Sequence, residues 1–212
     1  MDLSQLREEY KRAELSRNTL DDDPIKQFEK WFKEAMATVE KDPNAMSLAT
    51  VNAIGQPSLR TVLLKYFDER GFVFFTNYES RKARDIGQNP RVALLFPWLV
   101  LERQVKIEGI AEKVSFAETA RYFTTRPRGS QIGAWVSPQS SVIESRNFLL
   151  QKFEEMKVRF EKGQVPVPKH WGGYRVVPHV IEFWQGRPNR LHDRFQYSRQ
   201  ADGSWLIERL AP

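Results

Sequence analysis

Short apolar or β-branched segments follow one another closely through the first half of the chain, and this pattern constrains the fold more than any other feature. The segments cover residues 45–51, 59–67, 72–76, 92–96 and 105–114. Turn-forming or strand-breaking residues separate them, among them Gly55-Gln56-Pro57, the run 68–71 and Asn89-Pro90. Short strands with few helices between them favour an antiparallel barrel with peripheral helices over a doubly wound parallel sheet. The fold class expected is therefore mainly β.

Helices are predicted where the hydrophobic period changes. Asp23-Pro24 supplies an N-cap and a proline at the first helical position, and apolar residues at helical spacing follow as far as Val39. Ser115 with Glu118 forms a capping box that opens a short helix over 115–124. A longer helix is expected over 141–161.

Three further strands close the chain, at residues 174–184, 194–199 and 205–210. Asp202-Gly203 between the last two is a strong hairpin-turn signal. We expect an N-terminal arm over residues 1–20, docking as a short helix, and a single barrel domain over 21–212.

Composition excludes several kinds of protein. The chain has no cysteine, so it has no disulfide framework, thiolate metal site or cysteine nucleophile. His170 and His179 are isolated, and no metal site is expected. The polar N-terminus and the lack of an apolar run of about 20 residues predict a cytoplasmic protein. The formal net charge of +6 is compatible with ligands that carry phosphate and with nucleic acid.

The segment 78–84 places Arg81, Lys82 and Arg84 at the start of a helix capped by Ser80. Cations are unfavourable at the positive end of a helix dipole unless an anion binds there. A phosphate cradle is one interpretation, and a basic turn in solvent is the simpler one.

A second cationic segment is Arg190-Leu191-His192-Asp193-Arg194. In an extended chain, period two places Arg190, His192 and Arg194 on one face. Two guanidinium groups beside an imidazole can recognise an anion and can transfer or orient protons. A surface strand paired with carboxylates elsewhere is the alternative.

Several weaker candidates are scattered along the chain. Tyr122, Arg126 and Ser130 carry groups suited to phosphate oxygens, although Arg126 also fits a plain helix cap. The remaining candidates are Arg60 and Lys65 at the ends of a strand, the neutral donors Gln104, Gln139 and Ser140, and Trp184, whose residue pattern favours a core position.

Familiar nucleotide and hydrolase motifs are missing from the sequence. No glycine-rich strand-to-helix fingerprint or phosphate loop ending in Gly-Lys-Ser or Gly-Lys-Thr is present, which argues against a Rossmann dehydrogenase and a P-loop hydrolase. No serine lies in a nucleophile-elbow setting.

Taken in order, several strings resemble the pyridoxine/pyridoxamine 5′-phosphate oxidase family from about Arg7 to Pro212. They are R-T-V-L-L-K (60–65), F-T-N-Y-E-S-R-K (75–82), N-P-R-V-A-L-L-F-P-W (89–98), L-E-R-Q-V (101–105), R-P-R-G-S-Q-I-G-A-W-V-S-P-Q-S-S (126–141), W-G-G-Y-R-V (171–176), I-E-F-W-Q-G (181–186) and R-L-H-D-R-F (190–195). The resemblance implies a split-barrel flavoprotein that binds FMN at a homodimer interface. It implies oxidation of pyridoxine or pyridoxamine 5′-phosphate to pyridoxal 5′-phosphate, by hydride transfer from C4′ to flavin N5, with O2 reduced to H2O2.

The resemblance also implies roles for individual residues. FMN contacts would come from Arg60, Thr61, Val62, Leu63, Leu64, Lys65, Phe75, Thr76, Arg81, Lys82, Gln104, Gln139, Ser140, Trp184 and Arg194. Substrate contacts would come from Lys65, Tyr122, Arg126, Ser130, Arg190, Leu191 and His192, with Arg7, Glu8, Glu9 and Tyr10 as a lid. Arg190 and His192 would be catalytic, holding the pyridine ring against the flavin. Phe75 departs from the tyrosine expected in many relatives.

Two other functions remain as alternatives. Another split-barrel flavin oxidoreductase would share the barrel and the phosphate site but lack the Arg190-Leu191-His192 face. A basic barrel that binds single-stranded nucleic acid by aromatic stacking would show steeply salt-dependent binding and no chromophore.

Overall fold

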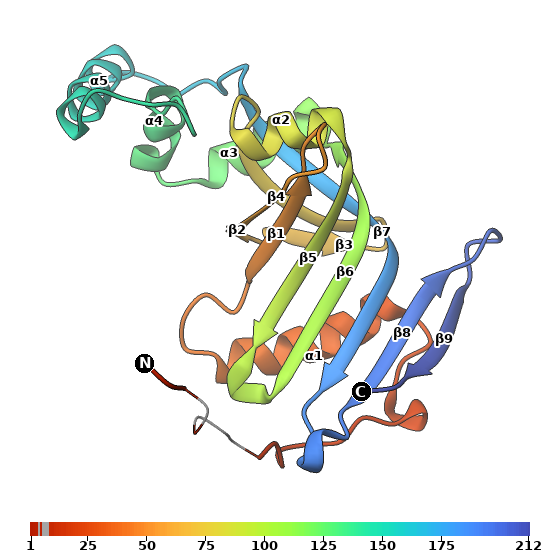
Figure 1. Ribbon diagram of the computed structural model, residues 1–212. Coiled ribbons are helices and arrows are strands. Elements are labelled where there is room, and N and C mark those ends of the chain that lie inside the picture. Colours follow the sequence, from red (N-terminus) through yellow and green to blue (C-terminus); the bar gives the residue numbers. More distant parts are fainter. Residues whose placement is uncertain (4, 6–8) are drawn as a thin grey trace.

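A computed structural model gives the fold and describes residues 1–3, 5 and 9–212. Its main element is a curled antiparallel sheet in the order β2-β1-β5-β6-β7-β4-β3, with β8 and β9 added beside β7 (Figure 1). The strands are β1 (Ala45–Val51), β2 (Pro57–Leu63), β3 (Tyr66–Asp68), β4 (Gly71–Asn77), β5 (Arg91–Trp98), β6 (Arg103–Lys113), β7 (Trp171–Gln185), β8 (Asp193–Arg199) and β9 (Trp205–Leu210). The mainly β prediction is confirmed.

The segment predicted as one strand over 59–67 is two strands that lie on different edges of the sheet. β2 pairs with β1, and β3 pairs with β4. Between them the backbone N–H of Leu64 donates to Asn44 O and that of Lys65 donates to Val73 O. The chain thus changes partner strand at these two residues, and the sheet curls into a barrel.

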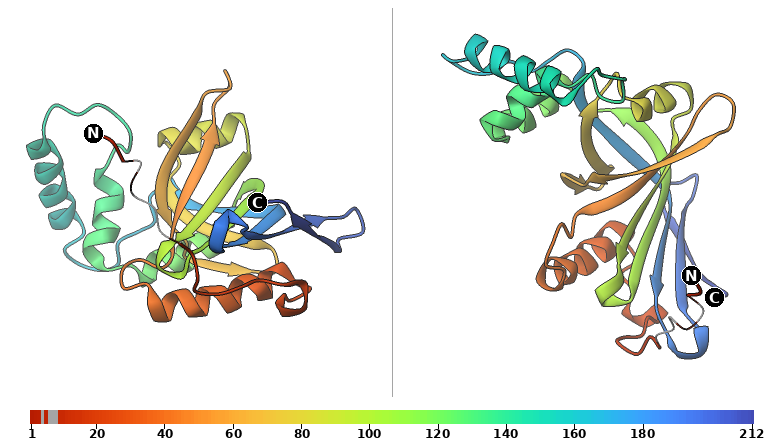
Figure 2. Two further views of the ribbon diagram at one scale, coloured as in Figure 1. Left: turned by 60° about the horizontal axis from the view of Figure 1, so that its bottom comes forward. Right: turned by 60° about the vertical axis from the view of Figure 1, so that its left-hand side comes forward.

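β7 pairs with β6 along one edge and divides its other edge between two strands. Residues 171–176 pair with β4, and residues 180–185 pair with β8. The register with β6 shifts at the junction, opposite Pro178, which has no N–H to donate. A Cβ on Gly109 would lie 2.5 Å from Val177 O, so only glycine fits the bulge. The barrel and the β8–β9 hairpin therefore diverge from one strand (Figure 2).

Helix α1 (Pro24–Thr38) covers one end of the barrel. Its predicted start is confirmed, since the Asp23 side chain accepts from the Ile25 N–H at 2.8 Å. The helix buries Phe28, whose ring centre lies 4.9 Å from that of Phe72 and 5.0 Å from that of Phe96. This aromatic cluster joins the helix to the barrel core.

The other helices lie at the opposite end of the barrel, where α4 and α5 extend away from it (Figure 1). They are α2 (Arg81–Gln88), α3 (Phe116–Thr125), α4 (Arg128–Val136) and α5 (Arg146–Arg159). The capping box of Ser115 and Glu118 is confirmed. The helix predicted over 141–161 begins later, because Ser145 caps it and accepts from Phe148 N–H. Helix α4 was not predicted.

The described part of the N-terminal arm contacts the β7–β8 connection, where Arg187 Nη1 donates to Ala13 O. Its described residues contain one 3-10 turn, Arg17–Thr19, so the short helix predicted for the arm is not found in them. Two more 3-10 turns cover Leu99–Leu101 and Pro188–Arg190. None of the helices within the described residues is both long and apolar enough to cross a membrane.

Candidate active site

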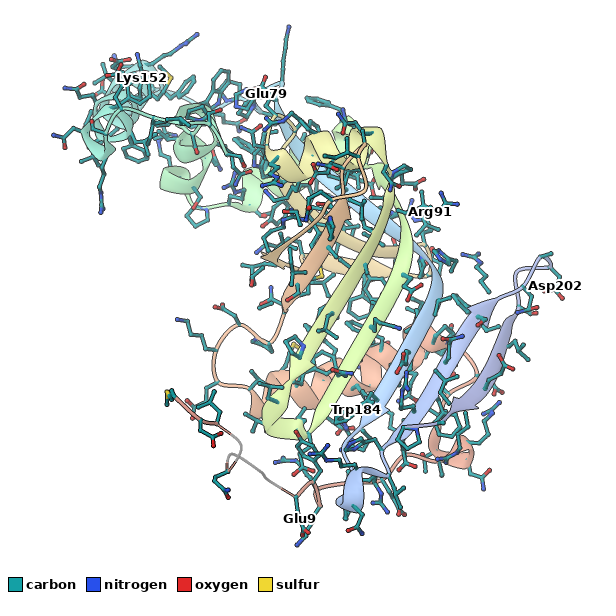
Figure 3. All side chains as sticks on the ribbon, viewed as in Figure 1. Glu9, Glu79, Arg91, Lys152, Trp184 and Asp202 are labelled. Atoms are coloured by element: carbon teal, nitrogen blue, oxygen red, sulfur yellow. The ribbon has the colours of Figure 1, made fainter. Side chains whose placement is uncertain are left out.

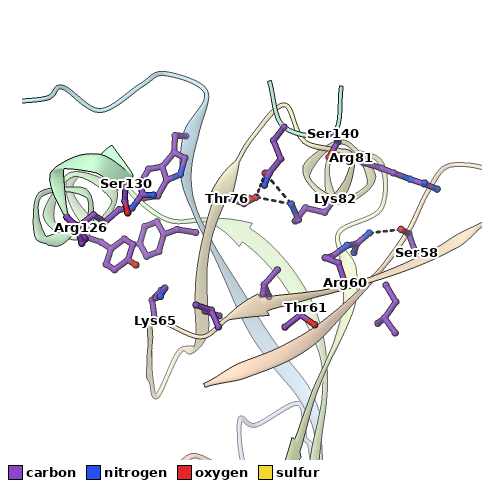
Figure 4. Close-up of a pocket in the computed structure, with 18 of the residues that line it drawn as sticks. Ser58, Arg60, Thr61, Lys65, Thr76, Arg81, Lys82, Arg126, Ser130 and Ser140 are labelled. Carbon is purple, nitrogen blue, oxygen red and sulfur yellow. Dashed lines mark hydrogen bonds between the residues drawn. The ribbon is translucent and has the colours of Figure 1, made fainter. Parts of the chain in front are cut away.

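A cavity of about 840 Å³ opens between β2, β4, α2 and the α3–α4 region. Most of the candidate residues of the first two thirds of the chain line it. The lining consists of Ser58, Leu59, Arg60, Thr61, Val62, Leu63, Lys65, Phe75, Thr76, Arg81, Lys82, Tyr122, Thr125, Arg126, Pro127, Ser130, Gln139, Ser140 and Trp171. In Figure 4, Arg60, Arg81 and Lys82 gather on one side of the cavity, and Lys65, Arg126 and Ser130 on the other.

Lys82 is a buried ammonium group at the first side of the cavity. Its Nζ donates to Thr76 Oγ1 (3.1 Å), Ser80 Oγ (3.4 Å) and Gln139 Oε1 (3.3 Å), all neutral oxygens. No carboxylate of the described residues forms an ion pair with it. Burial lowers the pKa of Lys82, and the charge of Arg60 lowers it further. An anion at this point would relieve both effects.

Arg60 is held beside Lys82 by hydrogen bonds to neutral groups. Its Nη1 donates to Leu48 O (3.0 Å) and Thr50 Oγ1 (2.8 Å), and its Nη2 donates to Ser58 Oγ (2.7 Å). Asp85 lies 3.9 Å away, a weak ion pair. Burial lowers the pKa of Arg60, the Asp85 charge opposes this shift, and Arg81 adds to it. Arg81 is exposed at the first position of α2. Three cations around a helix N-terminus suit a phosphate.

Arg126 is the main cation at the second side. Its guanidinium lies 4.6 Å from the ring centre of Trp171, and its buried Nη1 has no hydrogen-bond partner among the described residues. Burial lowers the pKa of Arg126. A buried donor without a partner is costly, so this atom is suited to a bound acceptor.

An aromatic stack stands beside Arg126. The ring of Phe75 lies 4.1 Å from that of Tyr122 and 5.3 Å from that of Trp171, both nearly parallel to it. The ring centres of Tyr122 and Trp171 lie 6.2 Å from each other, so the three rings form one compact cluster in the cavity wall. Such a wall is suited to the edge or face of a planar heterocycle.

The remaining candidates form a second group, which we call the distal cluster: Gln104, Trp184, Arg190, His192 and Arg194. None of them lines the cavity. Gln104, Trp184 and Arg194 are register partners across β6, β7 and β8. Figure 3 labels Trp184 at the end of the molecule opposite Glu79, which lies next to the start of α2.

Aromatic contacts hold the distal cluster together. The ring centre of Trp184 lies 4.6 Å from that of His192 and 5.8 Å from that of Tyr10. Tyr10 thus brings the arm onto the cluster. Its ring packs closely over Gly186, since a Cβ added to Gly186 would lie 2.6 Å from Tyr10 Cγ. Burial lowers the pKa of His192, and the charge of Arg190 lowers it further.

The extended conformation predicted for residues 190–192 is wrong. Pro188–Arg190 forms a 3-10 turn, Asn189 and Arg190 have φ values of 56° and 61°, and β8 begins only at Asp193. The alternation of Arg190, His192 and Arg194 on one strand face therefore does not exist. Instead, the turn folds His192 back onto Trp184.

Arg194 is tied to the protein itself. Its Nε donates to Glu182 Oε1 at 2.8 Å and its Nη1 donates to Ala211 O at 2.7 Å. Lys106 also pairs with Glu182, at 3.1 Å. Burial raises the pKa of Glu182, but the bonds from Arg194 and Lys106 outweigh burial and leave this pKa below its usual value. The hydrogen bond that Arg194 donates to Glu182 raises the pKa of Arg194.

A few candidates fall outside both groups. The Leu64 side chain is buried in the core, and Leu64 does not line the cavity. Leu191 is exposed, and Glu9 pairs with Lys11. Arg7 and Glu8 lie outside the described residues. Trp171 lines the cavity as well and was not among the predicted site residues, although it opens the W-G-G-Y-R-V string. Within the described part of the chain, no cluster of three or more His, Asp or Glu side chains is placed to hold a metal ion.

Two family models match the chain. One, described as pyridoxamine 5′-phosphate oxidase, matches residues 32–160. The other, described as the pyridoxine 5′-phosphate oxidase C-terminal dimerisation region, matches residues 171–212. The chain belongs to the pyridoxamine 5′-phosphate oxidase family. The distal cluster, Gln104 apart, lies within the second match.

Relatives in this family match over their whole length. Proteins named pyridoxine/pyridoxamine 5′-phosphate oxidase from Rippkaea orientalis and Crocosphaera subtropica are 66% and 65% identical to this chain, with 100% of both chains covered in each case.

Solved structures share the fold. The structure of PhzG from Burkholderia lata, in complex with tetrahydrophenazine-1-carboxylic acid, has a TM-score of 0.87 and 28% identity, covering 93% of this chain and 98% of its own. A pyridoxamine 5′-phosphate oxidase-related, FMN-binding protein from Nostoc punctiforme has a TM-score of 0.71 and 16% identity, covering 87% and 97%. The split-barrel prediction is confirmed by this likeness.

Proposed function

We propose that this protein is an FMN-dependent oxidase that converts pyridoxine 5′-phosphate and pyridoxamine 5′-phosphate to pyridoxal 5′-phosphate and reduces O2 to H2O2. The observation that carries the proposal is a single cavity with a cation at each side, the buried Lys82 and the half-buried Arg126 with its buried Nη1. Neither has an ion pair among the described residues. Flavin mononucleotide and the substrate each bring one phosphate. Full-length relatives of 65–66% identity bear the name of this enzyme.

The residues at the α2 side fit FMN. Lys82, Arg60 and Arg81 would hold its phosphate, since they combine positive charge, a helix N-terminus and few carboxylates. The neutral donors Gln139 and Ser140 lie on the same cavity wall and would bond the flavin. When bound, FMN supplies an acceptor for the hydride that leaves C4′ of the substrate and passes the electrons to O2.

The residues at the α3–α4 side fit the substrate. The buried Nη1 of Arg126 would donate to the substrate phosphate, and Lys65, Tyr122 and Ser130 from the same cavity would complete its binding. Holding the phosphate at this side fixes the pyridine ring within the cavity, which is the positioning that a hydride transfer requires.

The site needs the distal cluster as well, and we propose that a second copy of the chain supplies it. Within one chain the cluster lies away from the cavity. Most of it belongs to the region matched by the dimerisation model. A homodimer with two-fold symmetry would bring the Trp184–His192 face of one subunit to the cavity of the other, twice. Arg190 and His192 would then face the substrate ring. The cytoplasmic location, the arm over 1–20 and its role as a lid stay predictions.

Flavin reduction tests the activity directly. Purified protein is mixed with pyridoxine 5′-phosphate without oxygen, and the flavin absorbance is followed. We expect bleaching that air reverses, with H2O2 formed in proportion to pyridoxal 5′-phosphate. The mixing is repeated with pyridoxamine 5′-phosphate. A yellow protein whose flavin is bleached by neither compound contradicts the proposed function and favours another flavin oxidoreductase.

Subunit mixing tests the shared site. One variant, Arg81→Ala/Lys82→Ala, damages the cavity, and another, Arg190→Ala, damages the distal cluster. After the two inactive proteins are unfolded and refolded together, a mixed dimer contains one undamaged site, so about a quarter of the normal activity should return. Sites built within single subunits would give no recovery.

A further inference from the structure

The backbone of the β7–β8 connection makes a hydrogen bond to the predicted catalytic histidine. The N–H of Arg187 lies 3.1 Å from His192 Nδ1, across the turn that contains Asn189 and Arg190. A backbone N–H can only donate, so Nδ1 must accept with its lone pair. In a neutral imidazole one nitrogen carries the proton, and here that nitrogen is Nε2.

The surroundings hold this arrangement in place. The Arg187 guanidinium donates to Ala13 O (3.1 Å) and pairs with Asp193 (3.4 Å), and Gly186 N–H donates to Glu102 O (2.7 Å). The loop that presents the Arg187 N–H is therefore anchored at Gly186 and through the Arg187 side chain. The Trp184 ring, 4.6 Å from the imidazole, limits rotation of the ring about its Cβ–Cγ bond.

The charged and titratable groups around His192 oppose a second proton. Arg190 on the same loop brings positive charge near the ring, and Tyr10 on the arm packs 5.7 Å away. Asp193, the neighbouring carboxylate, is engaged by Arg187, Arg209 and the Leu15 N–H. Protonation of Nδ1 would also break the bond from Arg187.

We infer that His192 acts as a hydrogen-bond donor through Nε2–H and not as the base that removes a proton from the substrate. Nε2 makes no hydrogen bond to any other described residue, so its proton is available to an acceptor. This step rests on the proposed function, in which the acceptor is an oxygen of the substrate. We assign the acceptor to the ring hydroxyl next to the C4′ substituent. Arg187 is then a positioning residue, which acts through its backbone.

The tautomer can be measured without turnover. The chain has three histidines, so 15N-histidine labelling of the flavin-loaded protein gives few signals, and those of His192 are identified by their loss in His192→Gln. We expect an Nε2 of the pyrrole type that carries a proton and an Nδ1 of the pyridine type, at neutral pH and above. A protonated Nδ1 in this range would overturn the inference.

A pair of amide variants then tests the donor role. The glutamine amide nitrogen reaches about as far as Nε2, and that of asparagine only as far as Nδ1. A donor role predicts that His192→Gln retains roughly 3–10-fold more turnover than His192→Asn, as expected for a hydrogen bond between neutral groups. A base role predicts that both variants fall equally, by about 10²–10⁴-fold, because neither amide accepts a proton.

The two parts of the test fail separately. The labelling experiment needs no substrate, so an absent oxidase activity would count against the proposed function alone. Equal bound flavin in wild type and both variants establishes that the fold and the cofactor site are intact. Equal losses of turnover in such intact variants would contradict the donor role, whatever the tautomer.

Discussion

The cavity and the distal cluster use arginine and lysine in opposite ways. In the cavity, Lys82 bonds only to neutral oxygens and Arg126 keeps a buried nitrogen without a partner among the described residues. In and around the distal cluster, Arg194 is paired with Glu182, and Arg209 with Asp193. An unpaired buried cation is costly until an anion binds beside it, whereas the charge of a paired cation is already compensated within the protein. The cavity is therefore built for anions from outside, and the distal cluster for a fixed surface.

This difference gives each region a distinct expected response to mutation. Loss of a cavity cation should weaken ligand binding without destabilising the protein, because the folded state then buries less uncompensated charge. Loss of a paired group in the other region should expose its partner's charge and lower the free energy of unfolding. Arg190 is an exception in the distal cluster, since no described residue forms an ion pair with it.

The largest effect is expected from Arg81→Ala/Lys82→Ala. Losing two charge-assisted hydrogen bonds to a phosphate removes about 3–6 kcal/mol, so FMN should dissociate roughly 10²–10⁴-fold more readily. Flavin content after dialysis and fluorescence titration of the apoprotein measure this loss. Arg84→Ala on the same helix is the matched control, because Arg84 donates to Glu79 O and does not line the cavity. Normal flavin occupancy in the double variant would contradict the phosphate cradle.

A paired cation near the cavity should behave differently. Arg175 is 3% exposed and pairs with Asp68 and with Glu118, which caps α3. Arg175→Leu leaves Asp68 and Glu118 with the exposed Arg70 as their remaining cation. We therefore expect the free energy of unfolding of the apoprotein to fall by about 3 kcal/mol, the lower end of the range for a broken buried pair. Urea unfolding measures the change. Lys82→Met in the same assay should be neutral or stabilising, and a similar loss in both variants would remove the distinction between the two kinds of cation.

Arg190→Ala should separate binding from turnover. Arg190 is exposed and lies outside the cavity of its own chain, so FMN should be retained and stability should stay normal. Turnover of pyridoxine 5′-phosphate should fall by about 10²-fold, the usual effect of removing one positioned donor. Stopped-flow flavin reduction measures it, with Arg199→Ala on β8 as a control of equal charge. A normal reduction rate would contradict a role for this residue at the substrate.

Local signals in the sequence predicted much of the fold. The bounds of β1 and β9 and the caps of α1 and α3 follow from residues close together in the chain, such as Asp23-Pro24 and the pair Ser115 and Glu118. Helix α4 was missed because Pro127 and Gly129 indicate a loop. That helix is held by Ile132, which is buried in one hydrophobic cluster with Phe123 and Trp171, a long-range packing that no local pattern contains.

The candidate residues were predicted better than their arrangement. Strings quoted from the sequence contain most of the cavity lining, but their order does not tell which strings meet in one cavity. The division of β7 between β4 and β8 decides this, and it depends on long-range pairing. The turn at Arg190 had a local signal, since Pro188-Asn189 favours a turn, and the period-two interpretation overlooked it.

The smallest effect is expected from Glu182→Gln, which tests the fixed surface of the distal region. Glu182 is buried between Lys106 and Arg194, and their hydrogen bonds hold its pKa below the usual value. A lowered carboxylate pKa stabilises the folded state above the usual pKa and stops doing so as the pH falls through the lowered one.

Wild type should therefore be more stable than Glu182→Gln by about 1.5–3 kcal/mol at neutral pH, the value of hydrogen bonds to a charged group. This difference should shrink as the pH drops below about 4.5, where the unfolded carboxylate begins to bind a proton. Unfolding in urea at several pH values measures it, with Glu154→Gln on exposed α5 as the control. A difference that does not change with pH would mean that Glu182 acts by packing and not by charge. The paired, fixed character assigned to the distal region would then rest on its aromatic contacts alone.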